Sequence, residues 1–535
     1  MKNFLRKIFA SKVLCFILMF LEFAAVVVLW AFVELRFVDY AAHGTPPHER
    51  ALVDLIITIV FYALRAVLYV IDLLVFFKII IRDENPEYKI PWLALMFLLP
   101  IWTIVFYLVF VRNGIRKRDR KIVEPTKEIL LKYQDETEEE HNSLLAKIDP
   151  RYQGIFNYLR KATHLGLTEG NRMTYYRVGE DFFPEFVESL KKAEKFIFIE
   201  FFIIGEGIWW TKVLDVLKEK ATQGVDVRVI YDDIGSSGVV KSNMPDKLQK
   251  MGIKCHKFHP VMPTMSNTVN NRDHRKIVVV DHKLAFTGGM NLADEYANDE
   301  VKFGYWKDTM VKIEGPGIAN LIATFLQNYD LTTFQISNYD EFLKGDYPKF
   351  NDKGMAFAFG DAPGAFNDHE NIGEQNYINL LNVAVNRVDI STPYLICSYP
   401  MMRALMGAAK RGVEVNLFVP GVPDKKFVYY MAKSSFHVLL EAGVNIYVYK
   451  PGFNHEKQML VDDRVCFTGT INFDFRSLTH HFECGVTYID VPCLKEIKAD
   501  FEDMMTVSEK VPSDFKMKGW SRFLAGILKM FRVLF

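Results

Sequence analysis

The sequence predicts an α/β protein made of two tandem copies of one α/β unit, preceded by membrane-embedded helices. Three observations lead to this fold class. Strand-like and helix-like segments alternate from about residue 150 onward, which is typical of α/β domains. The same order of segments recurs later in the chain, about 170 to 190 residues on, which indicates a duplication. Long apolar stretches are confined to the part before residue 112, where a membrane region is therefore expected.

The membrane region is expected within residues 1–123, with two or three transmembrane helices. The apolar stretches are residues 13–33, 56–81 and 91–111. About 20 apolar residues are needed for a helix to cross a bilayer. The third stretch has no charged residue and the first has only Glu22. The second carries Arg65, Asp72 and Lys78, which we interpret as interfacial snorkelling and helix–helix contact.

Basic residues flank the apolar region on both sides and bear on its topology. They are Lys2, Arg6, Lys7 and Lys12 before it, and Arg112, Arg116, Lys117, Arg118, Arg120 and Lys121 after it. Both clusters favour the cytoplasmic side, but three crossings would separate them. The second cluster is denser, so we expect a multi-pass protein of the cell membrane whose remaining chain lies at the cytoplasmic face. Either the N-terminus is then outside, or one stretch does not cross.

A polar segment at residues 124–150 separates the membrane region from the repeated units. It contains "YQDETEEEHNS", which is typical of a solvated linker or an exposed helix. The last segment, residues 512–535, is basic and apolar. Two interpretations are open for it: a helix lying on the membrane surface, or a helix packed on the preceding domain.

The two α/β copies are expected at residues 151–350 and 351–511. In the first copy a buried strand (195–204), an amphipathic helix (210–224) and a second strand (225–232) follow one another. In the second copy the corresponding segments are residues 387–396, 401–412 and 413–420. A glycine–valine step begins the second strand of each copy, at Gly224 and at Gly412. The repeat therefore extends to details of the turns.

Charge and cysteine content exclude two classes of protein. Lysine and arginine number 65 and so do aspartate and glutamate, whereas nucleic-acid-binding proteins usually carry a basic excess. The six cysteines are scattered and form no C-x-x-C pair. Neither a zinc site nor a disulfide framework is predicted, and we interpret the cysteines as small buried side chains.

Each copy contains the same short motif, "HRKIVVVD" in the first and "HEKQMLVD" in the second. Its charged positions are His274, Lys276 and Asp281, and His455, Lys457 and Asp462. Side chains two apart on a strand point to one face, so each histidine and lysine should project together. A single H-x-K is more often an incidental surface pair. Two copies at equivalent places in a repeat, each followed by a glycine turn and an asparagine, favour a functional site.

The two aspartates admit two interpretations. Each falls where its apolar run ends, in "DHKL" and "DDRV", which are typical of hairpin turns. Asp281 and Asp462 therefore either hold the turns and strand ends or belong to the catalytic set. The position in the turn favours the structural interpretation, while the recurrence in both copies is compatible with either.

Two histidines and two lysines placed face to face form a set suited to phosphoryl transfer without a metal or another cofactor. One neutral histidine attacks phosphorus and forms a phosphohistidine, and the other protonates the leaving alkoxide. The lysines bind the non-bridging oxygens. Asn291 and Asn472, each after a glycine turn, are expected to donate further hydrogen bonds to phosphate.

A catalytic histidine is usually oriented by an acceptor at its other ring nitrogen. The repeat offers one carboxylate at the same place in each copy: Asp308 opens the strand of "WKDTMVKIEG", and Glu483 opens that of "FECGVTYID". We predict that Asp308 and Glu483 orient the two histidines. Glu295, in "ADEY", is a rival in the first copy.

The H-x-K-x4-D motif followed by "GGMN" or "GTIN" resembles the double motif of the phospholipase D superfamily. Within it the chain is similar to the bacterial cardiolipin synthases over nearly its full length. The resemblance rests on "NPEYKIPWLALMFLLPIWTIVFYLVF", "NRDHRK", "WKDT", "TPYLI", "PDKKFVYY" and "NFDFRSL". Three features depart from that pattern: Glu456 at a position that is usually small, His480-His481 before "FE", and an extra apolar stretch. We expect Glu456 to point away from the active face and to be tolerated.

The resemblance implies phospholipase D-type α/β/α sandwich domains in tandem, and a transphosphatidylation. Two phosphatidylglycerol molecules would react to give cardiolipin and glycerol, with His274 as nucleophile and His455 as acid. Alternatives are a hydrolase that uses water, an enzyme with another acceptor, and a non-catalytic membrane protein that binds anionic lipid. The expected partners are phosphatidylglycerol and cardiolipin and no nucleic acid. No feature of the sequence indicates an oligomeric state.

Overall fold

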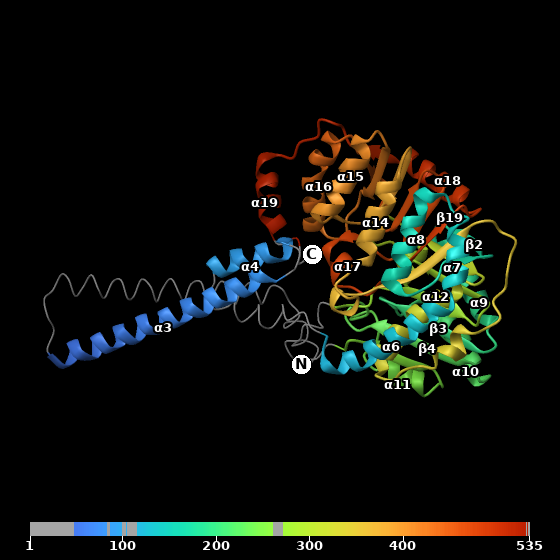
Figure 1. Ribbon diagram of the computed structural model, residues 1–535, viewed down its shortest axis with the longest axis horizontal. Coiled ribbons are helices and arrows are strands. Elements are labelled where there is room, and N and C mark those ends of the chain that lie inside the picture. Colours follow the sequence, from blue (N-terminus) through green and yellow to red (C-terminus); the bar gives the residue numbers. More distant parts are fainter. Residues whose placement is uncertain are drawn as a thin grey trace. The chain divides into compact units, whose positions relative to one another are not determined.

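The computed structural model describes residues 48–82, 86–98, 103, 115–260, 271–530 and 532 (Figure 1). The chain divides into two compact units, residues 1–113 with 261–267, and residues 114–260 with 268–535. In the first unit, α3 (His48–Ile81) and α4 (Pro86–Leu98) are the described helices. Val75, Ile79 and Met96 form a small buried cluster between these two helices.

The three expected transmembrane stretches are described to different extents. Residues 13–33 lie outside the described part, and residues 91–111 are described only at 91–98 and at 103. Residues 56–81 lie within α3, on which many large apolar side chains are exposed. No helix among the described residues combines the length and apolar character that a membrane crossing requires.

The second unit contains two mixed sheets, and the first sheet has seven strands in the order β2-β9-β7-β6-β3-β4-β5. Its strands are β2 (Arg172–Tyr176), β3 (Phe196–Phe201), β4 (Asp226–Asp232), β5 (Lys254–Phe258), β6 (Lys276–Val280), β7 (Leu284–Gly288) and β9 (Met310–Glu314). β3, β4 and β5 are parallel, and β6 runs antiparallel to β3. The β6–β7 hairpin turns at residues 281–283, as predicted.

The central strands of this sheet are apolar throughout because both of their faces are covered. Phe196 and Phe198 of β3 belong to one buried cluster, whereas Ile197 and Ile199 belong to another. This alternation is the two-residue period of a strand. Helices α9 (Gly179–Lys191) and α10 (Ile208–Thr222) contribute to the second cluster, and α12 (Ile318–Thr333) to the first. The helices therefore lie on both faces.

The second sheet repeats the first with one strand added at each end. Its order is β1-β10-β19-β17-β16-β11-β13-β14-β20, in which the seven middle strands correspond one by one to the first sheet. They are β10 (Met355–Asp361), β11 (Arg387–Ser391), β13 (Glu414–Pro420), β14 (Asn445–Tyr449), β16 (Gln458–Val461), β17 (Val465–Gly469) and β19 (Glu483–Ile489). This topology confirms the predicted tandem duplication.

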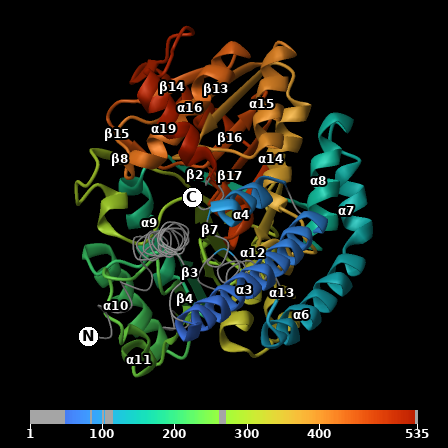
Figure 2. The same ribbon diagram turned by 90° about the vertical axis from the view of Figure 1, so that its left-hand side faces the viewer.

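The added strands are β1 (Thr168–Glu169) and β20 (Ser508–Lys510). β1 lies within the first sequence copy but pairs with β10 of the second sheet. The helices that contact the second sheet or one another around it are α8 (Pro150–Thr163), α14 (Ile372–Val383), α15 (Tyr399–Lys410), α16 (Lys426–Glu441) and α18 (Leu494–Thr506) (Figures 1 and 2). The two halves share one continuous buried cluster.

Two short parallel ladders complete the unit. β8 (Tyr305–Lys307) of the first half pairs with β15 (Gly452–Asn454) of the second, and β12 (Leu395–Ile396) pairs with β18 (Phe473–Asp474). The remaining short elements are α11 (Met244–Gln249), α13 (Tyr339–Leu343), α17 (Phe475–Thr479) and 3-10 turns at Asp294–Ala297 and Gly364–Phe366. The β8–β15 ladder joins the halves beside the second motif.

The polar segment at residues 124–150 is mainly helical and belongs to the second unit, so the expectation of a linker between the regions is wrong. It belongs to α6 (Lys117–Glu136) and α7 (Glu138–Leu145), and Leu130, Leu144 and Leu145 are buried in the shared core. Its polar composition reflects only the outward face of the two helices. Five cysteines, at 255, 397, 466, 484 and 493, are free and buried, as predicted, while Cys15 lies outside the described residues.

Candidate active site

The two motifs lie at equivalent ends of the two sheets. His274 and His455 precede β6 and β16, and both rings are buried, with 8% of each side chain exposed. Lys276 and Lys457 have no exposed surface. The charges of Lys457 and of His455 act on His274, so the groups of the two halves lie within electrostatic reach of one another. The structure thus brings the predicted histidines and lysines together.

The histidine of the first half is held by a carboxylate of the second. Nδ1 of His274 lies 2.9 Å from Oε2 of Glu483. Glu483 is itself fixed, because Ser477 Oγ donates to its Oε1 at 2.5 Å and Thr470 Oγ1 donates to its Oε2. Phe202 packs edge-on against the ring, with centroids 5.0 Å apart. These contacts fix one orientation of His274.

The histidine of the second half is held by a carboxylate of the first, so the arrangement is reciprocal. Nδ1 of His455 lies 2.6 Å from Oδ2 of Asp308, whose Oδ1 accepts from Thr309 N at 2.8 Å. A carboxylate at Nδ1 holds the proton there, which leaves the lone pair of a neutral ring on Nε2. Each histidine therefore has Nε2 available for a substrate.

Backbone hydrogen bonds repeat the same exchange between the halves. His274 N donates to Phe482 O at 2.8 Å, one residue before Glu483, and His455 N donates to Lys307 O at 2.7 Å, one residue before Asp308. Gly289 in the glycine turn leaves room for the Asp308 side chain, because a Cβ at Gly289 would lie 2.0 Å from Oδ1 of Asp308. Each active-site histidine is thus positioned by the half that does not contain it.

The two lysines lie close to the ring-carboxylate pairs. Lys276 Nζ donates to His274 O at 2.6 Å. Lys457 Nζ lies 3.8 Å from Asp308 Oδ2 and 2.8 Å from His455 Nδ1, and it also donates to His455 O. Two cationic groups in a buried site form a binding place for an anionic phosphoryl group.

Burial and mutual repulsion shift the pKa values of this cluster. Burial, followed by the charges of the two lysines, lowers the pKa of His274 and of His455 well below its ordinary value, so both rings are neutral near pH 7. Burial lowers the pKa of Lys276 to about 8 and that of Lys457 to about 7. Burial raises the pKa of Asp308 to about 6, against the lowering effect of Lys457. Such perturbed groups are typical of functional sites.

Asp281 and Asp462 lie at the other end of the motif strands. The Asp281 carboxylate accepts from the backbone N–H groups of residues 194, 195 and 196, each at 2.8 Å. Asp462 accepts in the same way from residues 385, 386 and 387, at 3.0, 2.7 and 3.0 Å. Seven residues of extended chain at about 3.3 Å each put roughly 20 Å between His274 and Asp281. Both aspartates therefore hold chain turns, and neither reaches the histidines.

The two predicted phosphate-binding asparagines differ in their contacts. Asn291 is occupied: its Nδ2 donates to the Tyr296 hydroxyl at 2.6 Å, and its Oδ1 accepts from Ile203 N at 3.1 Å. Asn472 is buried, and its Oδ1 has no hydrogen-bond partner in the described part of the chain. The rival carboxylate Glu295 pairs with Lys302 at 2.8 Å and not with a histidine.

The central residue of each motif also reaches across to the other half, which sequence reasoning missed. Arg275 Nε donates to Glu483 O at 2.9 Å. Glu456 is fully buried, and its Oε1 lies 2.6 Å from Lys307 Nζ, which also pairs with Asp500 at 2.6 Å. As predicted, Glu456 points away from the histidine, but it supports the residue before Asp308. A charged residue inside a buried motif was the available signal.

One group in the described residues has metal-ligating side chains close together: His274, His481 and Glu483 each offer an atom within 4.8 Å of the others. His481 Nδ1 lies 3.5 Å from Glu483 Oε1. Two histidines and one carboxylate form a ligand set that Zn²⁺ accepts. The group overlaps the His274–Glu483 pair, so a bound ion would engage the same side chains.

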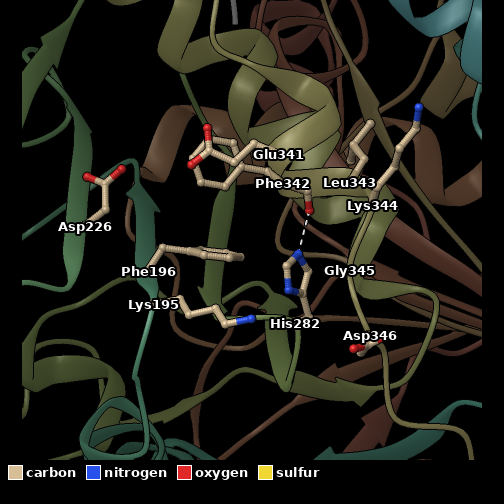
Figure 3. A pocket seen from close by; sticks show the side chains of 10 residues that line it. All are labelled: Lys195, Phe196, Asp226, His282, Glu341, Phe342, Leu343, Lys344, Gly345 and Asp346. Atoms are coloured by element: carbon tan, nitrogen blue, oxygen red, sulfur yellow. Dashed lines mark hydrogen bonds between the residues drawn. The ribbon is translucent and has the colours of Figure 1, made fainter.

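A pocket of about 630 Å³ opens beside Asp281, away from the histidines. Its lining residues are Lys195, Phe196, Asp226, His282, Glu341, Phe342, Leu343, Lys344, Gly345 and Asp346 (Figure 3). His282 is turned into the first half and contacts Phe342 O through Nε2 at 2.8 Å. The pocket contains none of the motif histidines or lysines, and its charges are mixed, so the candidate site remains the paired motif.

The duplicated mixed sheets and the paired H-x-K motifs define a phospholipase D-like protein. A solved structure of phosphatidylserine synthase from Haemophilus influenzae Rd KW20 has the same fold, with a TM-score of 0.56 and 14% identity, covering 72% of this chain and 100% of that one. The family model described as "Cardiolipin synthase, PLD-like domain" matches residues 186–328 and 377–505, about half of the chain. The chain therefore belongs to this family of phospholipase D-like cardiolipin synthases.

Curated relatives match the chain over most of its length. A cardiolipin synthase of Geobacillus sp. is 32% identical over 82% of this chain and 86% of its own length. A cardiolipin synthase of Staphylococcus aureus is 30% identical over 86% of this chain and 94% of its own. An uncharacterised protein of Streptococcus mutans is 40% identical over 79% of this chain and 90% of its own.

Proposed function

We propose that this protein is a cardiolipin synthase, a phosphatidyltransferase that joins two phosphatidylglycerol molecules and releases glycerol. The observation that carries the proposal is the reciprocal pair of histidine–carboxylate contacts, His274 with Glu483 and His455 with Asp308, beside two buried lysines. The cardiolipin synthases among its relatives cover nearly the same length of chain. The proposal extends their named activity to this chain.

In the first step Nε2 of His274 attacks phosphorus of one phosphatidylglycerol. A P–N bond forms and the bond from phosphorus to the glycerol oxygen breaks. His455, protonated at Nε2, gives its proton to the leaving oxygen, so glycerol departs neutral. The phosphatidyl group is then held on His274 as a phosphohistidine.

In the second step the roles of His455 reverse. Neutral His455 takes the proton from the free hydroxyl of a second phosphatidylglycerol, and that oxygen attacks phosphorus. The P–N bond breaks, cardiolipin is formed, and His274 is neutral again. Both steps use one geometry, since the leaving and entering hydroxyl groups occupy the same side of phosphorus.

The electrostatics of the site match this sequence of steps. The protein groups alone hold both rings neutral, which suits a nucleophile but not an acid. A bound phosphodiester adds a negative charge that offsets the two lysines and so raises the pKa of His455. Asp308 at Nδ1 then stabilises the imidazolium ring. Lys276 and Lys457 bind the non-bridging oxygens, where negative charge develops.

The asparagines are assigned different parts in phosphate binding. Asn472 lies in the buried site with its amide oxygen unpaired, and its amide nitrogen is the group that would donate to a phosphate oxygen. Asn291 holds Tyr296, whose ring lies 5.7 Å from that of His455. We therefore assign direct phosphate contact to Asn472 and support of the site wall to Asn291.

The protein is also proposed to act at the cytoplasmic face of the cell membrane, as a multi-pass protein. Support comes from the apolar stretches at residues 13–33, 56–81 and 91–111 and from the basic cluster after them. Both proposed substrates reside in the bilayer, so a membrane-bound enzyme meets them at high local concentration. Protease accessibility in sealed and opened vesicles tests this orientation.

The decisive experiment uses purified full-length protein with phosphatidylglycerol as the only lipid, in the presence of EDTA. We expect cardiolipin and glycerol in equal amounts, because the mechanism needs neither metal nor a second kind of lipid. Phosphatidic acid without cardiolipin would identify a hydrolase instead. No turnover would favour a lipid-binding protein, and activity only after metal addition would contradict the metal-free mechanism.

A further inference from the structure

The C-terminal helix α19 (Gly519–Met530) carries its apolar stripe on the outside of the unit. Trp520, Phe523, Leu524 and Ile527 are 75%, 60%, 45% and 42% exposed. They are spaced i, i+3, i+4 and i+7, which places them on one helix face. In a surface helix of a globular protein this face is normally the buried one.

The opposite face of α19 is the one that packs on the protein. Ala525 is 1% exposed, and Ser521, Leu528 and Lys529 are half-buried. Both views show α19 lying along α16, and Lys529 Nζ donates to Ser434 O of that helix at 3.3 Å (Figures 1 and 2). The small contact face holds α19 in place while its large apolar side chains point outward.

Basic residues surround the exposed stripe. Between residues 516 and 532 the chain has five basic residues and no acidic one. Lys516, Lys518 and Arg522 are exposed. A helix with one apolar face that contains tryptophan and with flanking lysine and arginine is the type that lies in the interface of an anionic bilayer. The charge pattern therefore favours anionic lipid as the occupant of this face.

The neighbouring helix α16 extends the same surface toward the candidate active site. Its first turn exposes Lys425, Lys426 and Phe427, and Tyr430 is exposed one turn later. Helix α16 contacts β12, and β12 pairs with β18, which directly follows Asn472 of the candidate site, so α16 lies near the site. A bilayer on the α16–α19 face would thus lie beside the histidine pair.

We propose that the outward face of α19, together with the first turns of α16, docks on an anionic lipid bilayer and presents the histidine pair to lipid at its surface. The inference rests on the proposed function in so far as the substrates are membrane lipids. The docking itself is a separate property and is measured without turnover.

Photo-crosslinking of the full chain in vesicles tests the proposal. The crosslinking amino acid p-benzoylphenylalanine replaces Phe523 in protein reconstituted into equimolar phosphatidylglycerol and phosphatidylethanolamine with a trace of tail-labelled phosphatidylglycerol. The control position is Val385, which is 54% exposed beside the Asp462 turn. We expect labelled lipid on the protein with the probe at 523 and none with the probe at 385.

Three outcomes would overturn the proposal. Crosslinks from position 523 to residues 1–113 of the same chain would show that the helices of the first unit cover α19. Crosslinks to a second copy would show a protein–protein interface. Equal lipid labelling at positions 523 and 385 would show only random contact with lipid. None of these outcomes depends on whether the protein makes cardiolipin, so failure of the docking and failure of the proposed function are distinguishable.

The charge requirement is tested by neutralising the basic residues around the stripe. In the triple variant K516Q/K518Q/R522Q, lipid labelling from position 523 should fall severalfold in vesicles with phosphatidylglycerol and change little in vesicles of phosphatidylcholine. Equal labelling of the two proteins in anionic vesicles would remove the electrostatic part of the proposal.

A kinetic variant links the face to the reaction. With Phe523→Asp, the ratio of the rate on phosphatidylglycerol vesicles to the rate on monomeric short-chain phosphatidylglycerol should fall about tenfold, because an interfacial aromatic anchor is lost. Val385→Asp is the matched control and should keep the wild-type ratio. An unchanged ratio in Phe523→Asp would contradict the docking role.

Discussion

At the scale of single residues, the Nδ1 atoms of His274 and His455 decide how the candidate site works. Each atom is hydrogen-bonded to a carboxylate: that of His274 lies 2.9 Å from Glu483, and that of His455 lies 2.6 Å from Asp308. Each ring therefore offers Nε2 to the substrate. Nothing in these two contacts distinguishes nucleophile from acid. The surroundings do differ, because Lys457 lies within 3.8 Å of Asp308 and close to the His455 ring. This cation opposes protonation of the ring, so His455, which we propose as the proton donor, becomes an acid only once a bound phosphodiester offsets the charge of Lys457.

The rate should depend on pH through the lysines and Asp308. Asp308, with a pKa of about 6, must be ionised to accept from His455, and Lys457 and Lys276, with pKa values of about 7 and 8, must be protonated to bind phosphate. We therefore expect kcat/KM, which reports the free enzyme, to fall below about pH 6 and again above about pH 7 to 8. The measurement is a pH profile of kcat/KM between about pH 5 and 9, a range that spans the pKa values of these three groups.

A lysine-to-arginine variant checks the assignment of the alkaline limb. The alkaline fall begins with Lys457, whose pKa of about 7 is lower than the value of about 8 for Lys276. Arginine stays charged throughout this range, so Lys457→Arg should move the start of the fall in kcat/KM to higher pH even if its absolute rate is lower. A wild-type kcat/KM that rises steadily from neutral to alkaline pH would rule out the proposed role of the protonated lysines in binding phosphate.

At the scale of elements, the turn after each motif strand is held by a carboxylate that accepts three backbone N–H groups. Because these hydrogen bonds are charge-assisted, Asp281→Ala should lower the free energy of unfolding by about 2 to 4 kcal/mol. The folded fraction should keep a rate within about threefold of wild type, because Asp281 lies far from the histidines. Chemical denaturation and single-turnover rates measure the two effects.

Asp462→Ala is the matched variant of the second half, and we expect the same pattern. A stable protein that has lost the reaction in either variant would return the aspartates to the catalytic set.

The ladder between β8 and β15 depends on a buried ion pair behind the second motif. Glu456 balances Lys307, and the backbone of Lys307 holds His455. Glu456→Ala should destabilise the protein by about 3 kcal/mol, since breaking a buried pair leaves an uncompensated charge. It should also lower kcat about tenfold or more through displacement of Asp308.

Glu456→Gln is the graded control for this pair. Its amide oxygen can still accept from Lys307, so both losses should be smaller than in Glu456→Ala. If alanine at this position is as stable and active as wild type, the original expectation that the position tolerates substitution holds and the support role is wrong.

At the scale of the whole molecule, the repeat made much of the fold predictable. Strands such as β3 and β11 are short apolar runs in the same order in both copies, and two sheets of matching strand order follow from them. Asp308 and Glu483 were found only by aligning the copies, and the geometry places both at the histidines. The crossing of each carboxylate to the other half was not predictable, because no local pattern specifies which half contributes the contact.

Other features escaped prediction for the same physical reason. β1 joins the second sheet although it precedes the first copy's main strands, and Arg275 binds the backbone of Glu483 more than 200 residues away in sequence. Both depend on how the halves meet. For α6 and α7 an exposed helix was one of the two predictions, but the burial of their inner faces was missed because their outward faces dominate the composition. Hydrophobic periodicity describes a local element well and an interface between copies poorly.

The central claim is that one site, shared by both halves, divides the work between two histidines. A phosphatidyl ester of p-nitrophenol tests it directly, because this leaving group departs without a proton from the acid. The measurement is the rapid release of nitrophenolate by His455→Ala and by His274→Ala. The account predicts a burst of about one equivalent per enzyme from His455→Ala, with slow turnover after it, and no burst from His274→Ala. A burst from His274→Ala, or its absence from both variants, would contradict the account.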